Sequence, residues 1–193
     1  MPPFHNMATR PDIKRADARR NREKLLVAAT ELFAASGNDV SLDAVAKRAG
    51  VGIGTLYRHF PTRDALVEAA YRNEVAQLCE AAGERLAEHE ADVALAEWMD
   101  RFVSYSTAKK GMRDALQSVV AGGSDLFADA RGQIVGAIAL LLAAGVADGT
   151  LRPDVDAEDV MRAMGAVWLI DDEEQARRLL RLLMDGLRHG THR

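Results

Sequence analysis

The sequence has only one cysteine, Cys79, so a disulfide within the chain is excluded. A lone thiol fits the reducing cytoplasm, where it serves either as a small buried side chain or as a redox sensor. The N-terminus, M-P-P-F-H-N-M-A-T-R, lacks the apolar core of a signal peptide. The longest uncharged run, Gly132 to Ala147, has 16 residues, fewer than the ~20 needed to span a bilayer. We therefore expect a cytoplasmic protein without a membrane segment, in which this run forms a central buried helix.

Aromatic residues are scarce, at 5%, and runs of β-branched residues are absent. Alanine, the strongest helix former, occurs 34 times, so we expect an all-α fold of about nine helices. The chain has 193 residues, of which 48% are hydrophobic, and it can therefore build a core in one domain or in two small ones.

Signatures of catalysis are also missing. The sequence has no H-E-x-x-H, no G-x-S-x-G and no cluster of cysteine and histidine, so we expect no enzyme, no cofactor and no metal site. Gly50, Gly52 and Gly54 lack both the lysine of a P-loop and the preceding strand of a dinucleotide-binding loop. His189 and His192 could bind a metal, but a frayed terminus is the ordinary interpretation.

The most informative segment runs from Val51 to Pro61, V-G-I-G-T-L-Y-R-H-F-P. Leu56 and Phe60 give a short helix one buried stripe, and Ile53 is expected close to that stripe. The opposite face has hydrogen-bond donors and no carboxylate, which suits the edge of a nucleic-acid groove; it comprises Gly54, Thr55 and Arg58, flanked by Tyr57 and His59. The alternative for the two flanking residues is a half-buried position without contact to DNA.

A second helix is predicted immediately before this segment. Ser41 is expected to cap a helix from Leu42 to Ala49, and a glycine-containing turn then leads into the next helix. This order is that of a helix-turn-helix unit. Pro61 ends the second helix, and Thr62 can cap a third that follows it. An upstream apolar stripe would close a three-helix core over the motif: Leu25, Leu26, Ala29, Leu32 and Phe33.

Residues 43–66, D-A-V-A-K-R-A-G-V-G-I-G-T-L-Y-R-H-F-P-T-R-D-A-L, resemble the DNA-binding domain of the TetR (tetracycline repressor) family. The likeness extends back through L-F-A-A-S-G, at residues 32–37. Gly52 and Ile53 depart from the commonest family pattern, which has serine and a polar or basic residue there. The resemblance implies a bacterial homodimer that binds palindromic double-stranded DNA and is associated with the nucleoid when bound. The expected DNA-binding residues are Ser41, Leu42, Gly54, Thr55, Tyr57, Arg58, His59 and Arg63.

Charge is distributed unevenly along the chain. Residues 1–63 hold 11 Lys or Arg and 6 Asp or Glu, whereas residues 64–193 hold 14 and 23. The attraction for phosphate is therefore localised at one end. We expect a flexible basic arm at residues 1–18, a helix-turn-helix domain at 19–66, and a ligand-binding and dimerisation domain at 67–193. The basic cluster near the first helix is either a solvated arm or a groove contact: Lys14, Arg15, Arg19, Arg20, Arg22 and Lys24.

Caps and apolar stripes predict further helices at about 63–86, 93–109, 112–120 and 125–148. Asp156 is expected to cap a helix that ends near Trp168, and Asp171 to cap a last helix that ends near Leu187. The last helix has a wider apolar surface than one core-facing stripe needs. The TetR resemblance implies that the last two helices pair with their symmetry mates in a four-helix dimer interface, with Met161, Leu179, Leu180, Leu183 and Leu187 as the expected interface residues. The alternative is burial against its own chain.

The family binds inducers between the DNA-reading end and the dimer interface. The expected pocket residues are Trp98, Met99, Phe102, Tyr105, Phe127, Met164 and Trp168, for each of which ordinary core packing is the alternative. They include few ionisable groups, so the small-molecule effector is expected to be largely apolar or aromatic. We therefore predict a repressor that this effector releases from its operator. The alternatives are a ligand-responsive activator of the same family, a small all-α enzyme, and an architectural DNA-coating protein, which the acidic body disfavours.

Overall fold

The computed structural model of the protein describes residues 10–36 and 39–188, with side chains from residue 15 onward. Regular structure in these ranges is helical, apart from an isolated β-bridge between Leu151 and Arg188. The helices are α1 (Arg10–Ser36), α2 (Leu42–Ala49), α3 (Ile53–His59), α4 (Arg63–Glu88), α5 (Ala91–Gly111), α6 (Arg113–Ala121), α7 (Leu126–Asp148), α8 (Ala157–Met164) and α9 (Glu173–Leu187). A short 3₁₀ segment, η2 (Gly165–Leu169), follows α8. The predicted all-α fold is confirmed.

The helices begin where the sequence places their caps. Ser41 Oγ accepts a hydrogen bond from the Ala44 N–H at 3.1 Å, and Thr62 Oγ1 accepts one from the Ala65 N–H at 3.1 Å. Such caps satisfy backbone donors that have no partner inside the helix. The cap predicted for the last helix is wrong by one residue, because Asp172, and not Asp171, accepts from the Glu174 N–H at 2.9 Å.

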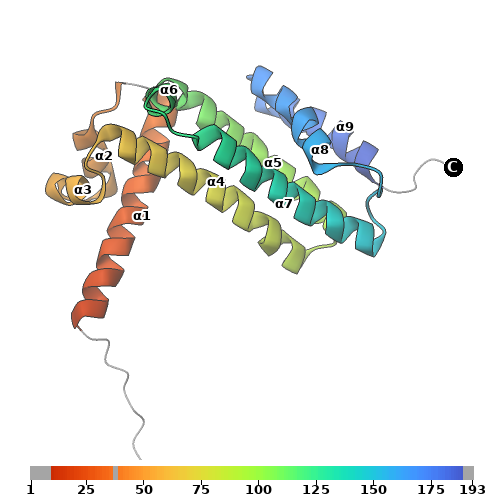
Figure 1. Cartoon of the computed structure of the whole chain (residues 1–193), viewed down its shortest axis with the longest axis horizontal. Helices are drawn as coiled ribbons and strands as arrows, with labels where there is room; N and C mark the ends of the chain where they lie inside the picture. Colours follow the sequence, from red (N-terminus) through yellow and green to blue (C-terminus); the bar gives the residue numbers. More distant parts are fainter. Residues whose placement is uncertain (1–9, 37–38, 189–193) are drawn as a thin grey trace, which may run out of the picture.

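The three long helices α4, α5 and α7 pack side by side and form the body of the protein (Figure 1). Helix α9 lies against α5, and α8 lies against α7. Helices α1, α2 and α3 occupy one end, and the N-terminal part of α1 extends beyond the body (Figure 1). Because α4 starts directly after α3 and continues through the body, one continuous helix connects both ends.

The three-helix core over the motif is confirmed. Leu25, Phe33 and Leu56 are fully buried, and Phe60 is nearly so. Ile53 was expected near the same stripe, but its side chain is 38% exposed. It is the first residue of the seven-residue helix α3, so no preceding turn of that helix covers it. Of the expected flexible arm, residues 10–18 lie in the first turns of α1, and residues 1–9 lie outside the described ranges.

Helix α7 was expected to be a central buried helix, and that expectation is wrong for one of its faces. Ile134, Ile138 and Leu141 are buried against the body, but Leu140 is 51% exposed and Val146 is 43% exposed. By length and composition alone α7 could cross a membrane. Its buried face packs against α4, α5 and α8.

Helices α1 and α5 approach each other unusually closely at Gly111. A Cβ atom built on this glycine would lie 2.2 Å from the carbonyl oxygen of Ala34 and 2.6 Å from its Cα. These are backbone atoms of α1, so a side chain at position 111 would have to push the two helices apart. The end of α5 is therefore in direct contact with the helix-turn-helix part of the chain.

Candidate nucleic-acid interface and aromatic cluster

Helix α3 shows a polar and largely accessible face at one end of the protein. Gly54 and Arg58 are exposed, Tyr57 is 50% exposed, and Thr55 and His59 are half-buried. Leu56, on the opposite side, is fully buried and anchors the helix. The five residues predicted to face a groove therefore lie on or beside the accessible surface of α3. The half-buried position of His59 also fits the alternative of a helix residue without contact to DNA.

Arg58 is held along its own helix. Its Nε donates to the Gly54 carbonyl oxygen at 3.1 Å, and its Nη2 donates to Thr55 Oγ1 at 3.1 Å. These bonds restrict the rotamers of a long side chain and place the guanidinium and the threonine hydroxyl together. A guanidinium fixed in this way loses less conformational entropy when it binds than a free one would.

Two helix starts flank α3 and present groups suited to phosphate. Ser41 and Leu42 lie at the start of α2, where backbone N–H groups lack partners within the helix. Arg63 lies in the first turn of α4, and its guanidinium carbon is 4.8 Å from the centre of the Phe33 ring. The guanidinium therefore stacks on the face of this ring, in a cation–π contact.

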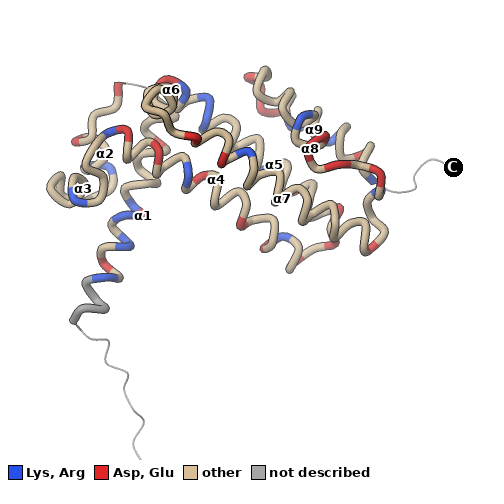
Figure 2. The backbone as a smooth tube through the Cα atoms, viewed as in Figure 1, with Lys and Arg blue, Asp and Glu red and all other residues tan. Residues whose placement is uncertain are grey.

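Positive charge continues from α3 along α1. Figure 2 shows Lys and Arg spaced along the described length of α1, on the part that extends beyond the body. Arg22 lies over the Phe60 ring at 5.5 Å, so this basic helix is packed directly on the motif. Some of the charge is already neutralised, because Arg20 pairs with Asp17, and Arg48 of α2 pairs with Glu31 at 2.8 Å.

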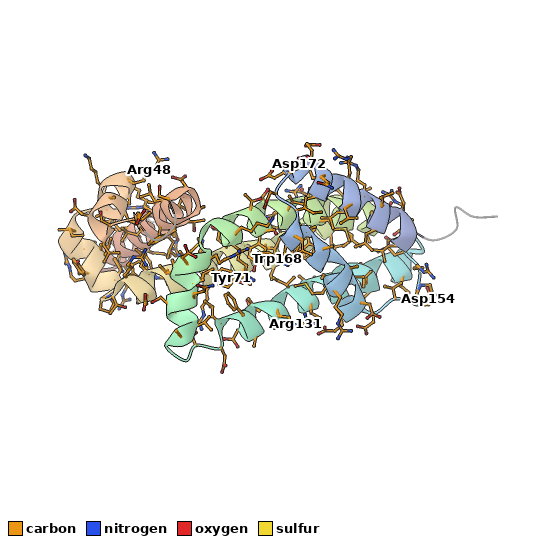
Figure 3. All side chains as sticks on the ribbon, turned by 90° about the horizontal axis from the view of Figure 1, so that it is seen from above. Arg48, Tyr71, Arg131, Asp154, Trp168 and Asp172 are labelled. Carbon is orange, nitrogen blue, oxygen red and sulfur yellow. The ribbon has the colours of Figure 1, made fainter. Side chains whose placement is uncertain are left out.

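A cluster of aromatic rings fills the region between α4, α5, α7 and η2. The Tyr71 ring lies 5.9 Å from Phe127 and 6.1 Å from Tyr105, and the Trp168 ring lies 5.9 Å from Tyr105 and 6.0 Å from Phe102. We call these five residues the aromatic cluster. Tyr71, Phe102 and Tyr105 are buried, Trp168 is half-buried, and Phe127 is 39% exposed. Figure 3 shows Tyr71 and Trp168 pointing into the space between α7 and η2.

Lys109 inserts its ammonium among these rings. The Nζ atom is 4.3 Å from the centre of the Trp168 ring, 4.6 Å from that of Phe127 and 5.6 Å from that of Tyr71. Burial lowers the pKa of Lys109 below its ordinary value. Neither Lys109 nor Tyr71 was among the residues predicted for the pocket. A signal for Lys109 was available, because it continues the apolar stripe of Trp98, Phe102 and Tyr105 at helical spacing.

The two tyrosines of the cluster bond to each other. Their hydroxyl oxygens are 2.6 Å apart, and burial raises the pKa of both Tyr71 and Tyr105. Both phenols therefore stay neutral at physiological pH. Nearby on α5, the buried Ser106 Oγ has no hydrogen-bond partner among the described residues.

The structure does not gather all the predicted pocket residues in one place. Phe102, Tyr105, Phe127 and Trp168 belong to the aromatic cluster, and Trp98 touches it through Phe102 at 6.1 Å. Three clefts, each of about 300 Å³, lie elsewhere around α5; Trp98, Met99 and Tyr105 each line a different one. Met164 is fully buried. Among the described residues no three His, Cys, Asp or Glu side chains are grouped as metal ligands, and His189 and His192 lie outside those residues.

Helix α9 has two apolar stripes that face different ways. Ala176, Leu180, Met184 and Leu187 are each at most 3% exposed and pack into the body. Leu182 is 70% exposed, and Leu179, one turn before it, is half-buried on the same outer side, whereas the half-buried Leu183 packs against the chain's own core. Of the residues predicted for a dimer interface, Leu180, Leu187 and Met161 are therefore buried within one chain. Leu179 remains partly accessible beside the exposed Leu182, and Leu169 in η2 is 88% exposed.

Two parts of the chain match known protein families separately. The profile described as bacterial regulatory proteins of the tetR family matches residues 25–70. The profile of the SbtR-like transcriptional regulator C-terminal domain matches residues 90–189, which is more than half of the chain.

Solved structures that resemble this one cover nearly its whole length. The TetR transcriptional regulator SCO0520 from Streptomyces coelicolor is 48% identical, with a TM-score of 0.81 over 86% of this chain and 98% of that one. A TetR transcription regulatory protein from Mycobacterium vanbaalenii is 38% identical, with a TM-score of 0.76 over 90% of this chain and 98% of that one.

A curated relative matches about a third of the chain. The HTH-type transcriptional regulator SAR0097 from Staphylococcus aureus is 38% identical over 68 residues, which are 34% of this chain and 35% of that protein. The match therefore spans about a third of the length of that relative.

Proposed function

Because the chain belongs to the TetR family of helix-turn-helix transcriptional regulators, we propose that it is a cytoplasmic, homodimeric repressor that a small molecule releases from a palindromic operator. The observation that carries this proposal is the accessible face of α3, which has hydrogen-bond donors and no carboxylate. The fully buried Leu56 on the opposite side anchors the helix in the core. The acidic remainder of the chain would limit binding to unrelated DNA.

Each α3 would enter the major groove, and the two copies in a dimer would meet successive grooves about 34–36 Å apart. Thr55 and Arg58 would then read base edges, because they lie together on the accessible face. Tyr57, Arg63 and the start of α2 would contact the backbone on either side. A selection for bound sequences from random DNA tests this proposal: an inverted repeat whose half-sites are one helical turn apart supports it, and the absence of any enriched sequence contradicts it.

Base readout and phosphate contact should respond differently to mutation. Arg63→Ala and Tyr57→Ala are expected to weaken binding to all sequences similarly, and Arg63→Ala should lower the salt slope of log K by about one unit. Thr55→Ala and Arg58→Ala should instead change base preference, with about 1–3 kcal/mol lost per readout contact. Binding measured across a set of operator variants and salt concentrations separates the two. If the Thr55→Ala, Arg58→Ala double variant keeps an unchanged preference, these residues do not read the bases.

Release requires that the effector favour a conformation in which the two α3 helices do not fit successive grooves. Two connections lead from the aromatic cluster to the DNA-binding end. Helix α4 carries Tyr71 in the cluster and Arg63 beside α3. Helix α5 carries Lys109 in the cluster and, two residues later, Gly111 against the backbone of Ala34. A coupling of about 1–3 kcal/mol through these helices would lower operator affinity by about 5–150-fold.

The exposed edge of the aromatic cluster offers a test of release. Trp98 and Phe102 are fully buried, and Trp98 Nε1 donates to the Leu78 carbonyl oxygen at 2.7 Å, so their removal would damage the core. Phe127→Ala is preferable, because this side chain is 39% exposed. For a compound that releases the wild-type protein in a metabolite screen, we expect Phe127→Ala to raise the concentration needed by about tenfold, or about 1.4 kcal/mol.

Leu140→Ala is the matched control, since Leu140 is 51% exposed on the same helix and lies outside the aromatic cluster. Gel-shift titration with the compound measures both variants, and an equal response of the two contradicts an effector site at the cluster. Repression itself is tested by deleting the gene: transcription from a reporter linked to the selected operator should rise. A fall would identify an activator.

A further inference from the structure

The ammonium of Lys109 lies among aromatic rings, without a counter-charge from the part of the chain that the structure describes. It is within 5.6 Å of three ring centres, and Nζ is only 4.3 Å from the closest, that of Trp168. Among residues 15–36 and 39–188, no carboxylate forms a salt bridge with it and no acceptor hydrogen-bonds with it. The negative faces of the rings stabilise the positive charge. The rings do not, however, accept hydrogen bonds from the three N–H groups of the ammonium in the way that a carboxylate would. A half-buried ammonium of this kind has unused capacity for an anion.

The other charged groups around the cluster already have partners. Arg72 of α4 pairs with Glu68 at 2.9 Å and with Asp129 at 3.6 Å. Lys110 donates to the carbonyl oxygen of Ile170, and its Nζ is 3.5 Å from an oxygen of Asp171.

Arg131, one turn after Phe127 on α7, pairs with Glu158 of α8. The site therefore offers one uncompensated positive charge, which matches a monoanion and not a phosphate with two negative charges.

The remaining surface of the site is apolar and aromatic. Phe127 and Trp168 leave part of their surfaces open to solvent, and Tyr71 and Tyr105 satisfy each other's hydroxyl groups at 2.6 Å. A ligand would find flat ring faces and edges here, together with a single strong donor. Aromatic rings prefer to pack edge to face or offset against such surfaces.

We propose that the effector is an aromatic monocarboxylate whose carboxylate pairs with Lys109 and whose ring packs against Trp168 and Phe127. This inference rests on the proposed effector site at the aromatic cluster and names the chemical class that the site takes. The anion supplies the acceptor that the described residues do not provide. Lys109 lies two residues before Gly111 on α5, and Gly111 contacts the backbone of α1. A ligand that displaces the Lys109 ammonium would therefore move α5 close to its contact with α1.

Three probes of nearly equal size, phenylacetate, phenylacetamide and phenethylammonium, test this proposal by titration of the full-length protein. Tryptophan fluorescence follows binding directly, because Trp168 lies beside Lys109. We expect phenylacetate to bind about tenfold more tightly than phenylacetamide, and phenethylammonium to bind more weakly than either.

Lys109→Met should remove the preference for the acid, because methionine keeps a similar length in the aromatic surroundings without the charge. Lys109→Arg should retain the preference. The matched control is Arg162→Met, which removes a positive charge from a side chain that is 70% exposed on α8 and should leave all three affinities unchanged. Thermal melts establish that each variant is folded.

Equal affinities for the acid and the amide, a preference for the ammonium, or no binding by any probe would overturn the proposal. So would a preference for the acid that survives Lys109→Met. Binding is measured without DNA, so failure of the release mechanism appears separately. If phenylacetate binds through Lys109 but does not lower operator affinity, the anion site stands and the proposal of ligand release at this site fails.

Discussion

Leu182→Glu is expected to convert the dimer into monomers and to lower operator affinity by about a hundredfold or more, since a dimer gains ~10²–10⁴ from binding two half-sites at once. Leu182 is 70% exposed in one chain and lies on the outer side of α9 with the half-buried Leu179, one turn before it. A stripe of leucines on the surface is typical of an interface with another chain. A charge in the middle of such an interface would be buried without a partner, which is costly. Light scattering at micromolar concentration and gel-shift titration measure the two effects.

The control for this prediction is Leu180, two residues earlier. Leu180 is 3% exposed and packs into the body of its own chain. Leu180→Ala is therefore expected to lower the free energy of unfolding by about 2–5 kcal/mol without changing the oligomeric state of the folded protein. If Leu182→Glu remains a dimer with unchanged operator affinity, the outer stripe of α9 is not the dimer interface.

A second large effect is expected at Gly111, where the two parts of the chain meet. Gly111→Ala would place a Cβ 2.2 Å from the carbonyl oxygen of Ala34, so α1 and α5 must move apart. We expect the free energy of unfolding to fall by about 1–3 kcal/mol, the ordinary cost of overpacking. Operator affinity should fall as well, because α1 carries the core on which α3 is packed. Chemical denaturation and gel-shift titration measure these changes.

Gly83→Ala is the matched control for this substitution. Gly83 lies inside α4, and a Cβ there would meet nothing within 4 Å. Because alanine favours the helix more than glycine does, this variant should gain about 0.5–1 kcal/mol of stability. If the two glycines respond alike, the close approach of α5 to α1 has no energetic consequence.

The helix-turn-helix unit could be predicted from the sequence, because its determinants are local. Ser41 and Thr62 cap helices within three residues of themselves, and Gly50 takes a left-handed conformation with φ of 65° at the end of α2. Leu56 and Phe60 are buried as their spacing requires. Such features depend on hydrogen bonds and on periodicity within a few residues, and both can be recognised in the sequence alone.

Which apolar side chains face the protein's own core could not be decided in this way. Leu180 and Leu182 are chemically identical and lie two positions apart, yet one is buried and the other is 70% exposed. The difference arises because only one side of α9 packs against α5. Helix periodicity gives the angle between two apolar stripes, but it does not determine which of them packs against the body. The same reason applies to α7, whose apolar residues occupy both its buried and its exposed face.

The sequence by itself determined the class of fold, the helix-turn-helix unit and the concentration of positive charge at one end, since each follows from short-range patterns or from composition. Only the tertiary structure decided that Lys109 stands among Tyr71, Phe127 and Trp168, and that Gly111 touches Ala34. These groups come from α1, α4, α5, α7 and η2, which are far apart along the chain. Their meeting depends on how whole helices pack, and packing is set by the combined surfaces of all the helices rather than by any one segment.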